Sequence, residues 1–75
     1  MITAVKQINE RYVVGSDEHI YRLPHTVNGK EYRLRKIKKV HEHYYFIDGD
    51  KTHEDDIVTT PIEPYILIKQ VNRLK

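Results

Sequence analysis

The chain contains no cysteine, which excludes a disulfide framework and any zinc site built on thiolates. It has one serine, Ser16, without an obvious base, and its three glycines form no phosphate-cradling loop. The usual sequence signs of serine chemistry and of nucleotide hydrolysis are therefore missing. We expect a protein that is not an enzyme and that has no catalytic residue, no metal site and no cofactor.

No stretch approaches the roughly 18 consecutive apolar residues that are needed to cross a bilayer. The first six residues, Met1 to Lys6, lack the apolar run of a signal peptide. Long blocks of like charge are also missing, since acidic and basic residues are interleaved and the net charge is only +2. We expect a folded, cytoplasmic protein with no membrane partner.

What the chain does contain suits one small domain over residues 1–75. Hydrophobic residues make up 39% of it, and six tyrosines with one phenylalanine favour an ordered, aromatic-rich core. Because no cross-link is possible, a domain of this size depends on packing or on a partner chain for its stability.

Short runs of β-branched and aromatic residues, separated by turn residues, predict an all-β domain. Two hairpin turns are expected at Asn28-Gly29 and Asp48-Gly49, since both pairs tolerate positive φ. One helical turn is compatible with Glu54–Asp56. The expected strands are Arg11–Gly15, His19–Leu23, Glu31–His41, Tyr44–Ile47 and Lys51–Ile57, whereas Ile2–Ile8 suits a strand or a short helix.

The longest expected strand, Glu31–His41, breaks strict alternation. Tyr32 and Leu34 share one face, whereas Ile37 falls on the other. A β-bulge or a sharp bend between Arg35 and Ile37 restores the pattern, as is common where a small sheet curls into a barrel.

The C-terminal segment has two interpretations. A strand over Tyr65–Val71 is favoured, because β-branched and aromatic residues dominate it. A short helix is the alternative, with Thr60 as its cap and Pro61 in the first helical position. The sequence leaves residues 65–75 open between strand and helix.

The runs Tyr44–Gly49 and His53–Ile57 resemble part of the SH3-like small β-barrels of the Tudor and KOW kind. They give a strand, a tight turn, a second strand and an acidic turn, and they cover less than half of the chain. The first thirty residues depart from that pattern and would have to supply an extra hairpin. The resemblance implies an SH3-like barrel or antiparallel meander that binds peptides, modified side chains or nucleic acid.

A basic run on the longest expected strand is the clearest charged feature. Five positive charges fall within seven residues and could follow a phosphate backbone, while nearby tyrosines stack on unpaired bases. The alternative is a solvated strand face whose lysines protect a sheet edge. The residues are Arg33, Arg35, Lys36, Lys38 and Lys39.

Three histidines and an acidic turn are the other candidates for chemistry. His41 and His43, with His53 across the expected hairpin, match no zinc signature, so ordinary surface histidines are the favoured interpretation. The carboxylates of Glu54–Asp56 are expected to cap backbone amides or to stay solvated rather than to do acid–base work.

A surplus of apolar residues supplies the functional hypothesis. In Tyr44–Ile47 neighbouring aromatic and aliphatic residues alternate between faces, so apolar side chains emerge on both, and Tyr65–Ile68 repeats the pattern. Either a further hairpin or helix covers the outer face, or that face is a protein-binding patch or a homodimer contact.

We expect a non-catalytic module that binds and modulates another protein. In composition the chain is similar to small accessory proteins of phages and mobile elements. Nucleic-acid binding through the basic strand and a structural role in a larger assembly are the alternatives. Tyrosine and arginine often dominate interface energies, so the expected protein contacts are Tyr44, Tyr45, Tyr65, Arg33 and Arg35.

Overall fold

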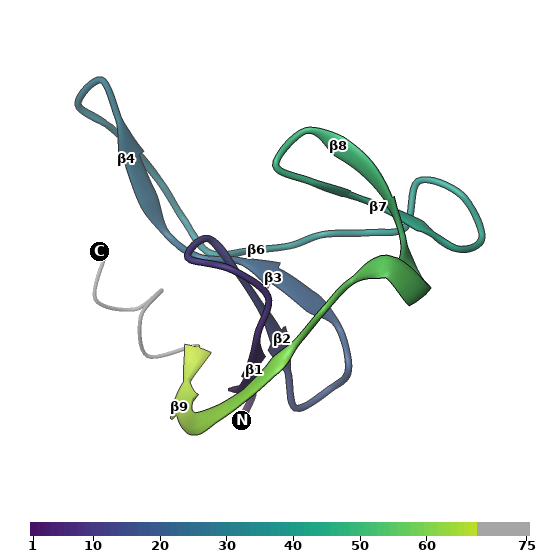
Figure 1. Ribbon diagram of the computed structural model, residues 1–75. Helices are drawn as coiled ribbons and strands as arrows, with labels where there is room; N and C mark the ends of the chain where they lie inside the picture. Colours follow the sequence, from purple (N-terminus) through teal and green to yellow (C-terminus); the bar gives the residue numbers. More distant parts are fainter. Residues whose placement is uncertain (68–75) are drawn as a thin grey trace.

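The protein is all-β, as the sequence predicts. The structure is a computed structural model that describes residues 1–67, and over residues 1–66 the only helical element is the 3₁₀ turn η1 (Glu54–Asp56). Figure 1 shows a central sheet with a two-stranded hairpin at either end. The sheet is antiparallel with the order β6-β3-β2-β1-β9, made of β1 (Thr3–Gln7), β2 (Tyr12–Gly15), β3 (Ile20–Arg22), β6 (Arg35–Lys36) and β9 (Thr60–Ile66).

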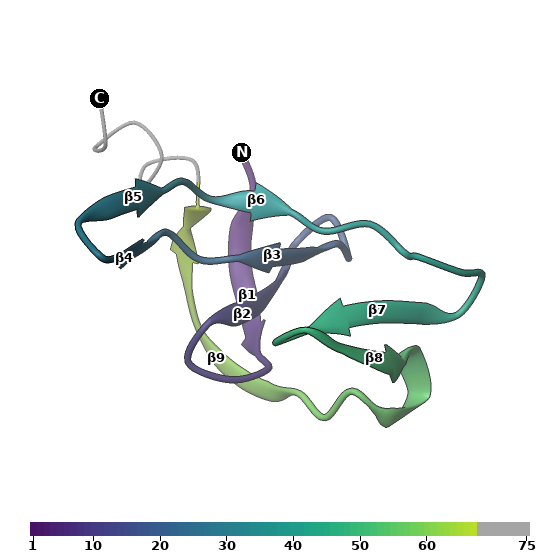
Figure 2. The same ribbon diagram turned by 90° about the horizontal axis from the view of Figure 1, so that it is seen from above.

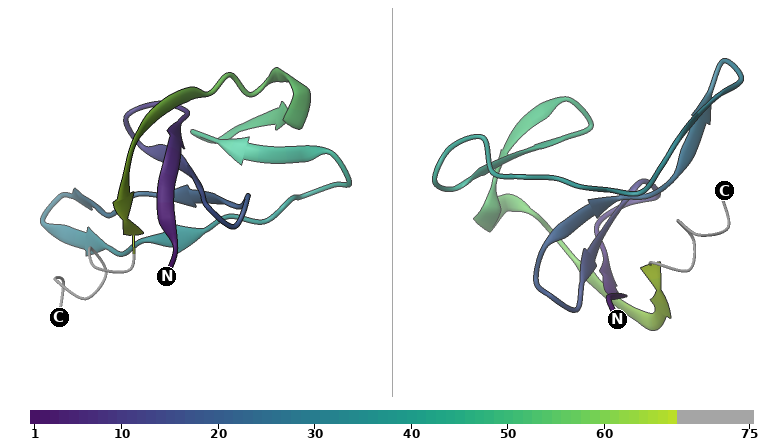
Figure 3. Two further views of the ribbon diagram at one scale, coloured as in Figure 1. Left: turned by 90° about the horizontal axis from the view of Figure 1, so that it is seen from below. Right: turned by 180° about the vertical axis from the view of Figure 1, so that it is seen from behind.

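The first hairpin, β4 (His25–Val27) with β5 (Lys30–Tyr32), continues the ribbon formed by β3 and β6. It projects away from the central sheet (Figures 1 and 3). Pairing stops at Leu23-Pro24 and Arg33-Leu34, then resumes in the same register. Proline has no N–H to give to the ladder, which accounts for the interruption.

The expected bulge between Arg35 and Ile37 is therefore wrong, and so is a continuous strand over Glu31–His41, because pairing is interrupted at Arg33-Leu34 and ends after Lys36. Leu34 packs against the cluster around Val13, whereas Ile37 packs against the cluster around Tyr12, so the two side chains lie on opposite faces of a sheet that buries apolar residues on both. The register shift that the sheet does contain lies in β1, between Ala4 and Lys6.

The second hairpin, β7 (Tyr44–Ile47) with β8 (Asp50–His53), lies at the other end of the central sheet (Figure 2). Both predicted two-residue turns are confirmed. Asn28 and Gly29 have φ of 51° and 81°, and Asp48 and Gly49 have φ of 56° and 82°. Positive φ at both central residues matches the right-handed twist of the strands.

The sheet buries apolar side chains on both faces. One cluster contains Ala4, Val13, Tyr21 and Leu67, and the other contains Tyr12, Ile20 and Ile47. Neighbouring residues such as Tyr12 and Val13 therefore belong to opposite clusters. The β7–β8 hairpin covers the second face through Ile47, with Tyr45 packed against the same cluster.

The last strand, β9, contains Pro61 and Pro64, which were expected to precede it. A helix that starts at Thr60 is wrong, because Thr60 and Pro61 pair with β1. The favoured strand over Tyr65–Val71 agrees with the structure at Tyr65 and Ile66. At Leu67 the chain is helical rather than extended, so the predicted strand is wrong there, and residues 68–71 lie outside the described residues.

The described strands form antiparallel sheets and do not close into a barrel. The resemblance to SH3-like barrels stays a prediction. Over residues 1–67 no helix has the length and apolar character needed to span a bilayer.

Candidate functional site

A row of side chains crosses three strands of the central sheet. Tyr12 in β2 lies opposite Arg22 in β3, and Arg22 lies opposite Arg35 in β6. Residues directly opposite in antiparallel strands project from the same face, so these side chains stand next to one another. Beyond the bend, His25 lies opposite Tyr32, and their rings stack with centroids 4.8 Å apart and planes inclined by 9°.

These residues enclose an open hollow of about 480 Å³, which we call the arginine groove. Its size falls within the roughly 300–1,000 Å³ that is typical of ligand sites. Within the described chain its lining includes three arginines and no aspartate or glutamate. The lining residues are Tyr12, Arg22, His25, Tyr32, Arg33, Leu34 and Arg35.

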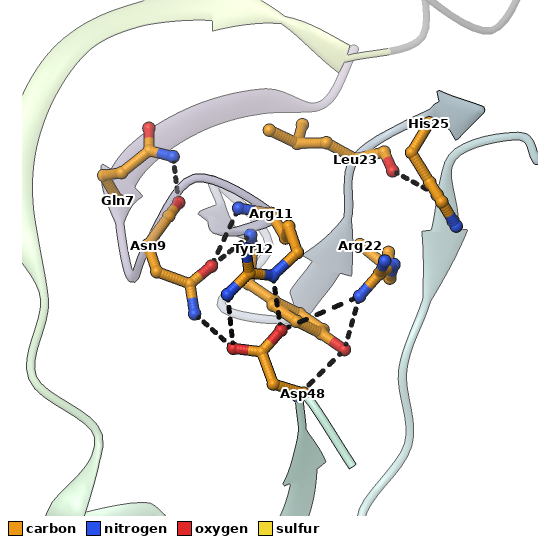
Figure 4. Close-up of polar contacts among 8 residues, drawn as sticks. All are labelled: Gln7, Asn9, Arg11, Tyr12, Arg22, Leu23, His25 and Asp48. Carbon is orange, nitrogen blue, oxygen red and sulfur yellow. Dashed lines mark hydrogen bonds and ion pairs between the residues drawn. The ribbon is translucent and has the colours of Figure 1, made fainter. Parts of the chain in front are cut away.

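Arg22 is held in place on the floor of the groove. Its Nη1 donates a hydrogen bond to the Tyr12 hydroxyl over 3.0 Å, and its Cζ lies 5.2 Å from the Tyr12 ring centroid (Figure 4). The backbone N–H of Asp48 donates to the same hydroxyl over 3.2 Å. Because Tyr12 is buried, these contacts orient Arg22 before any ligand arrives.

Asp48 joins the tip of the β7–β8 hairpin to the turn before β2 (Figure 4). Its carboxylate accepts hydrogen bonds from Arg11 Nε and Nη2 at 2.5 and 3.0 Å and from Asn9 Nδ2 at 2.9 Å. It also lies 3.9 Å from Arg22 Nη1. The hydrogen bonds from Arg11 lower the pKa of Asp48, and burial, which acts in the opposite direction, is outweighed.

The predicted basic run divides into paired and unpaired cations. Lys36 lies 3.9 Å from Asp17, and Lys39 lies 3.5 Å from Glu54. Within residues 1–67, neither Arg33 nor Arg35 forms an ion pair. The two arginines at the groove are thus left available for an anionic ligand.

A second, smaller hollow of about 220 Å³ adjoins the arginine groove, and we call it the Phe46 cleft. Arg35 lines both hollows. Phe46, the only phenylalanine in the chain, is 48% exposed. The lining residues are Arg35, Lys36, Ile37, Lys38 and Phe46.

The three tyrosines predicted as protein contacts do not form one patch. Tyr45 packs against the cluster around Tyr12, and Tyr65 packs against the cluster on the opposite face. Tyr44 meets His53 edge to face, with ring centroids 5.0 Å apart. Of the five predicted contacts, the structure brings together only Arg33 and Arg35.

The predicted histidine cluster is a pair of rings beside a carboxylate. The rings of His43 and His53 have centroids 5.8 Å apart, and His43 Nδ1 lies 2.6 Å from Glu54 Oε2. That contact is the main cause of the lowered pKa of Glu54. His41 instead lies against Tyr44, and no group of three possible metal ligands occurs within residues 1–67.

Sequence reasoning missed Tyr12, Arg22 and His25. A signal for two of them was present, because the two-residue turn at Asn28-Gly29 fixes the register of the whole ribbon. Counting outwards from that turn places His25 opposite Tyr32 and Arg22 opposite Arg35. Nothing local indicates that Tyr12 lies beside Arg22.

No family model, no curated protein and no solved structure matches this chain. The function therefore has to be inferred from the geometry and charge of the two hollows.

Proposed function

We propose that the protein binds nucleic acid through the phosphate backbone, with the arginine groove as its principal contact. The observation that carries the proposal is a hollow lined by Arg22, Arg33 and Arg35, of which Arg33 and Arg35 form no ion pair within residues 1–67. The planar guanidinium fork matches two phosphate oxygens at once, and it keeps its charge throughout the physiological pH range.

Two features favour a phosphate chain over a single small anion. The groove is open, and its cations continue along the chain into Lys38 of the Phe46 cleft. Each phosphate neutralised by a cation releases counterions, which makes such binding favourable at low salt and steeply salt-dependent. A net charge of +2 is small, so the local excess at the groove has to supply the attraction.

The test is a titration of labelled mixed-sequence DNA and RNA at ~50 and ~200 mM salt. The informative variant is Arg33→Ala/Arg35→Ala, and the control is Lys6→Glu, which lowers the net charge by the same two units. Lys6 lies in β1, three strands away from β6, and lines neither hollow. We expect the arginine variant to lose at least about tenfold in affinity at low salt and about one unit of salt slope per cation removed. The control should retain most of the wild-type affinity and most of the salt slope.

The absence of binding to either nucleic acid at ~50 mM salt would overturn the proposal. Equal losses in the arginine variant and in Lys6→Glu would also count against it, because net charge rather than the groove would then be responsible. Binding to an acidic protein that nucleic acid fails to displace would favour the protein-binding hypothesis instead. A modulating role, self-association and the absence of catalysis stay predictions.

A further inference from the structure

We infer that the arginine groove and the Phe46 cleft together hold an unpaired nucleic-acid strand, whose bases stack on Tyr32 and Phe46. The inference rests on the proposed function and adds the class of ligand to it. It follows from two exposed aromatic rings, one lining each of the two hollows that share Arg35.

Tyr32 is built as a platform. His25 lies opposite Tyr32 in the paired strand, and its ring stacks almost parallel to the Tyr32 ring. This contact supports the Tyr32 ring from one side and orients it. The side chain nevertheless remains 41% exposed. Lys30 Nζ lies 5.4 Å from the ring centroid, and its long exposed side chain can turn aside for a base and remain close enough to contact a phosphate.

Phe46 offers a second platform on a separate element, β7. It lines the cleft with Ile37 and Lys38, while neighbouring Ile47 is buried in the core. Together the two linings contain Tyr32, three arginines, Lys36, Lys38 and Phe46. Grooves that bind single strands without sequence preference combine the same two parts, cations for the backbone and rings for the bases.

The length of protein backbone from Tyr32 to Ile37 fits a short strand of nucleic acid. Tyr32 and Ile37 are five residues apart, so the backbone between them spans at most about 17 Å at roughly 3.3 Å per residue. A span of this length suits a strand of about four nucleotides, at the lower end of the site sizes found for small single-strand binders. A duplex keeps its bases stacked on one another, and it can offer the groove only its phosphates.

The first measurement uses a property of the sequence, which contains no tryptophan. Tyr32→Trp and Phe46→Trp each place one fluorophore at a proposed stacking position. We expect dT12 to quench both tryptophans, and a 12-base-pair duplex at matched phosphate concentration to quench neither. Tryptophan at Val58, which is 79% exposed and lines neither hollow, is the control and should remain unquenched by both ligands.

The second measurement is affinity. Tyr32→Leu and Phe46→Leu keep apolar bulk but remove the π face, and we expect each to weaken dT12 binding about tenfold with little change in salt slope. Tyr32→Phe should bind like the wild-type protein. Duplex affinity should stay within about twofold in all of these variants, and melting temperatures should show that each one is folded.

The outcomes separate the inference from the proposed function. If dT12 and the duplex bind equally well and the leucine variants lose nothing, the stacking inference is overturned and backbone binding stands. If neither ligand binds at ~50 mM salt, both fail. Tighter binding of dT12 than of the duplex, together with weaker dT12 binding by both leucine variants, would support the stacking inference and the proposed function.

Discussion

Tyr21 joins the core to the turn that precedes β3. Its side chain is buried beside Ala4 and Val13, and its hydroxyl donates a 2.7 Å hydrogen bond to Asp17 Oδ2. Burial, followed by the hydrogen bond to Asp17, raises the pKa of Tyr21 to about 12. Gly15 makes this arrangement possible, because a Cβ there would lie 2.8 Å from the Tyr21 ring and 2.7 Å from the Asp17 carboxylate.

The pKa of Asp17 is shifted in the opposite direction to that of Tyr21. Burial by itself would raise its pKa, but the hydrogen bonds from the Tyr21 hydroxyl and from the His19 N–H outweigh burial and lower it. The carboxylate therefore stays ionised and keeps the Tyr21 hydroxyl protonated. The hydrogen bond between Tyr21 and Asp17 thus contributes to both pKa shifts.

The pH dependence of stability at this residue follows from the raised pKa of Tyr21. The unfolded chain loses the tyrosine proton near pH 10, whereas the folded chain keeps it until about pH 12. Above pH 10 the unfolded state therefore binds fewer protons, and the free energy of unfolding decreases as pH rises through this window. We expect urea midpoints to fall between pH 9 and pH 11.5.

The control for this prediction is Tyr21→Phe, which lacks the titrating group. Its urea midpoint should start lower at pH 8, because the hydrogen bond to Asp17 is lost. Its decline at alkaline pH should be shallower than that of the wild-type protein. Parallel declines in the two proteins would show that another group is responsible.

The β7–β8 hairpin shows how an element is attached to the fold. Its Ile47 enters the core, while the turn residue Asp48 binds Arg11 and Asn9, which are more than thirty positions away in the sequence. The turn thus has two functions. It reverses the chain with a positive φ, and it carries the carboxylate that anchors the hairpin to the sheet.

Asp48→Asn separates these two functions, because asparagine tolerates the φ of 56° but carries no charge. We expect the free energy of unfolding to fall by about 1 kcal/mol at pH 7, as is typical for a partly exposed, multiply hydrogen-bonded ion pair. The lowered pKa of Asp48 means that its contribution is present above about pH 4 and is lost as pH falls through the folded value. The difference between variant and wild type should therefore shrink at pH 3.

The matched control for Asp48→Asn is Asp50→Asn in the same hairpin. Asp50 is exposed and forms no ion pair within residues 1–67. Its substitution should change the free energy of unfolding by only a few tenths of a kcal/mol. A comparable loss in both variants would mean that the network around Asp48 adds nothing specific.

For the whole molecule, the two edges of the central sheet decide how it meets other chains. The β6 edge carries Arg35 and Lys36, and the β9 edge carries Pro61 and Pro64. Charged residues and prolines both discourage a second chain from adding a strand, the first by repulsion and the second by removing donors. A small open sheet needs such protection, because within residues 1–67 its edges do not pair with each other.

Pro61→Thr/Pro64→Thr restores two backbone donors and raises the β-propensity of the β9 edge. We expect this variant to self-associate more strongly than the wild-type protein, with sedimentation coefficients that rise between about 10 and 200 μM. Thr60→Val is the control, since it raises β-propensity without adding an N–H group. Equal self-association in all three proteins would show that the prolines do not protect this edge.

The amino-acid sequence by itself determined the local features. The all-β class, both hairpin turns and the helical turn at Glu54–Asp56 follow from the backbone preferences of neighbouring residues, so they were predicted correctly. The presence of Arg33 and Arg35 in a basic run was equally evident.

Only the tertiary structure decided which side chains meet. The bend at Leu23-Pro24 turns the ribbon so that His25 and Tyr32 share a hollow with Arg22, and no local preference specifies that direction. Burial on both faces of the sheet likewise separates Tyr45 from Tyr65, although both had appeared to be exposed anchors. These arrangements depend on contacts between segments that are distant in the sequence. A pattern of neighbouring residues does not specify such contacts.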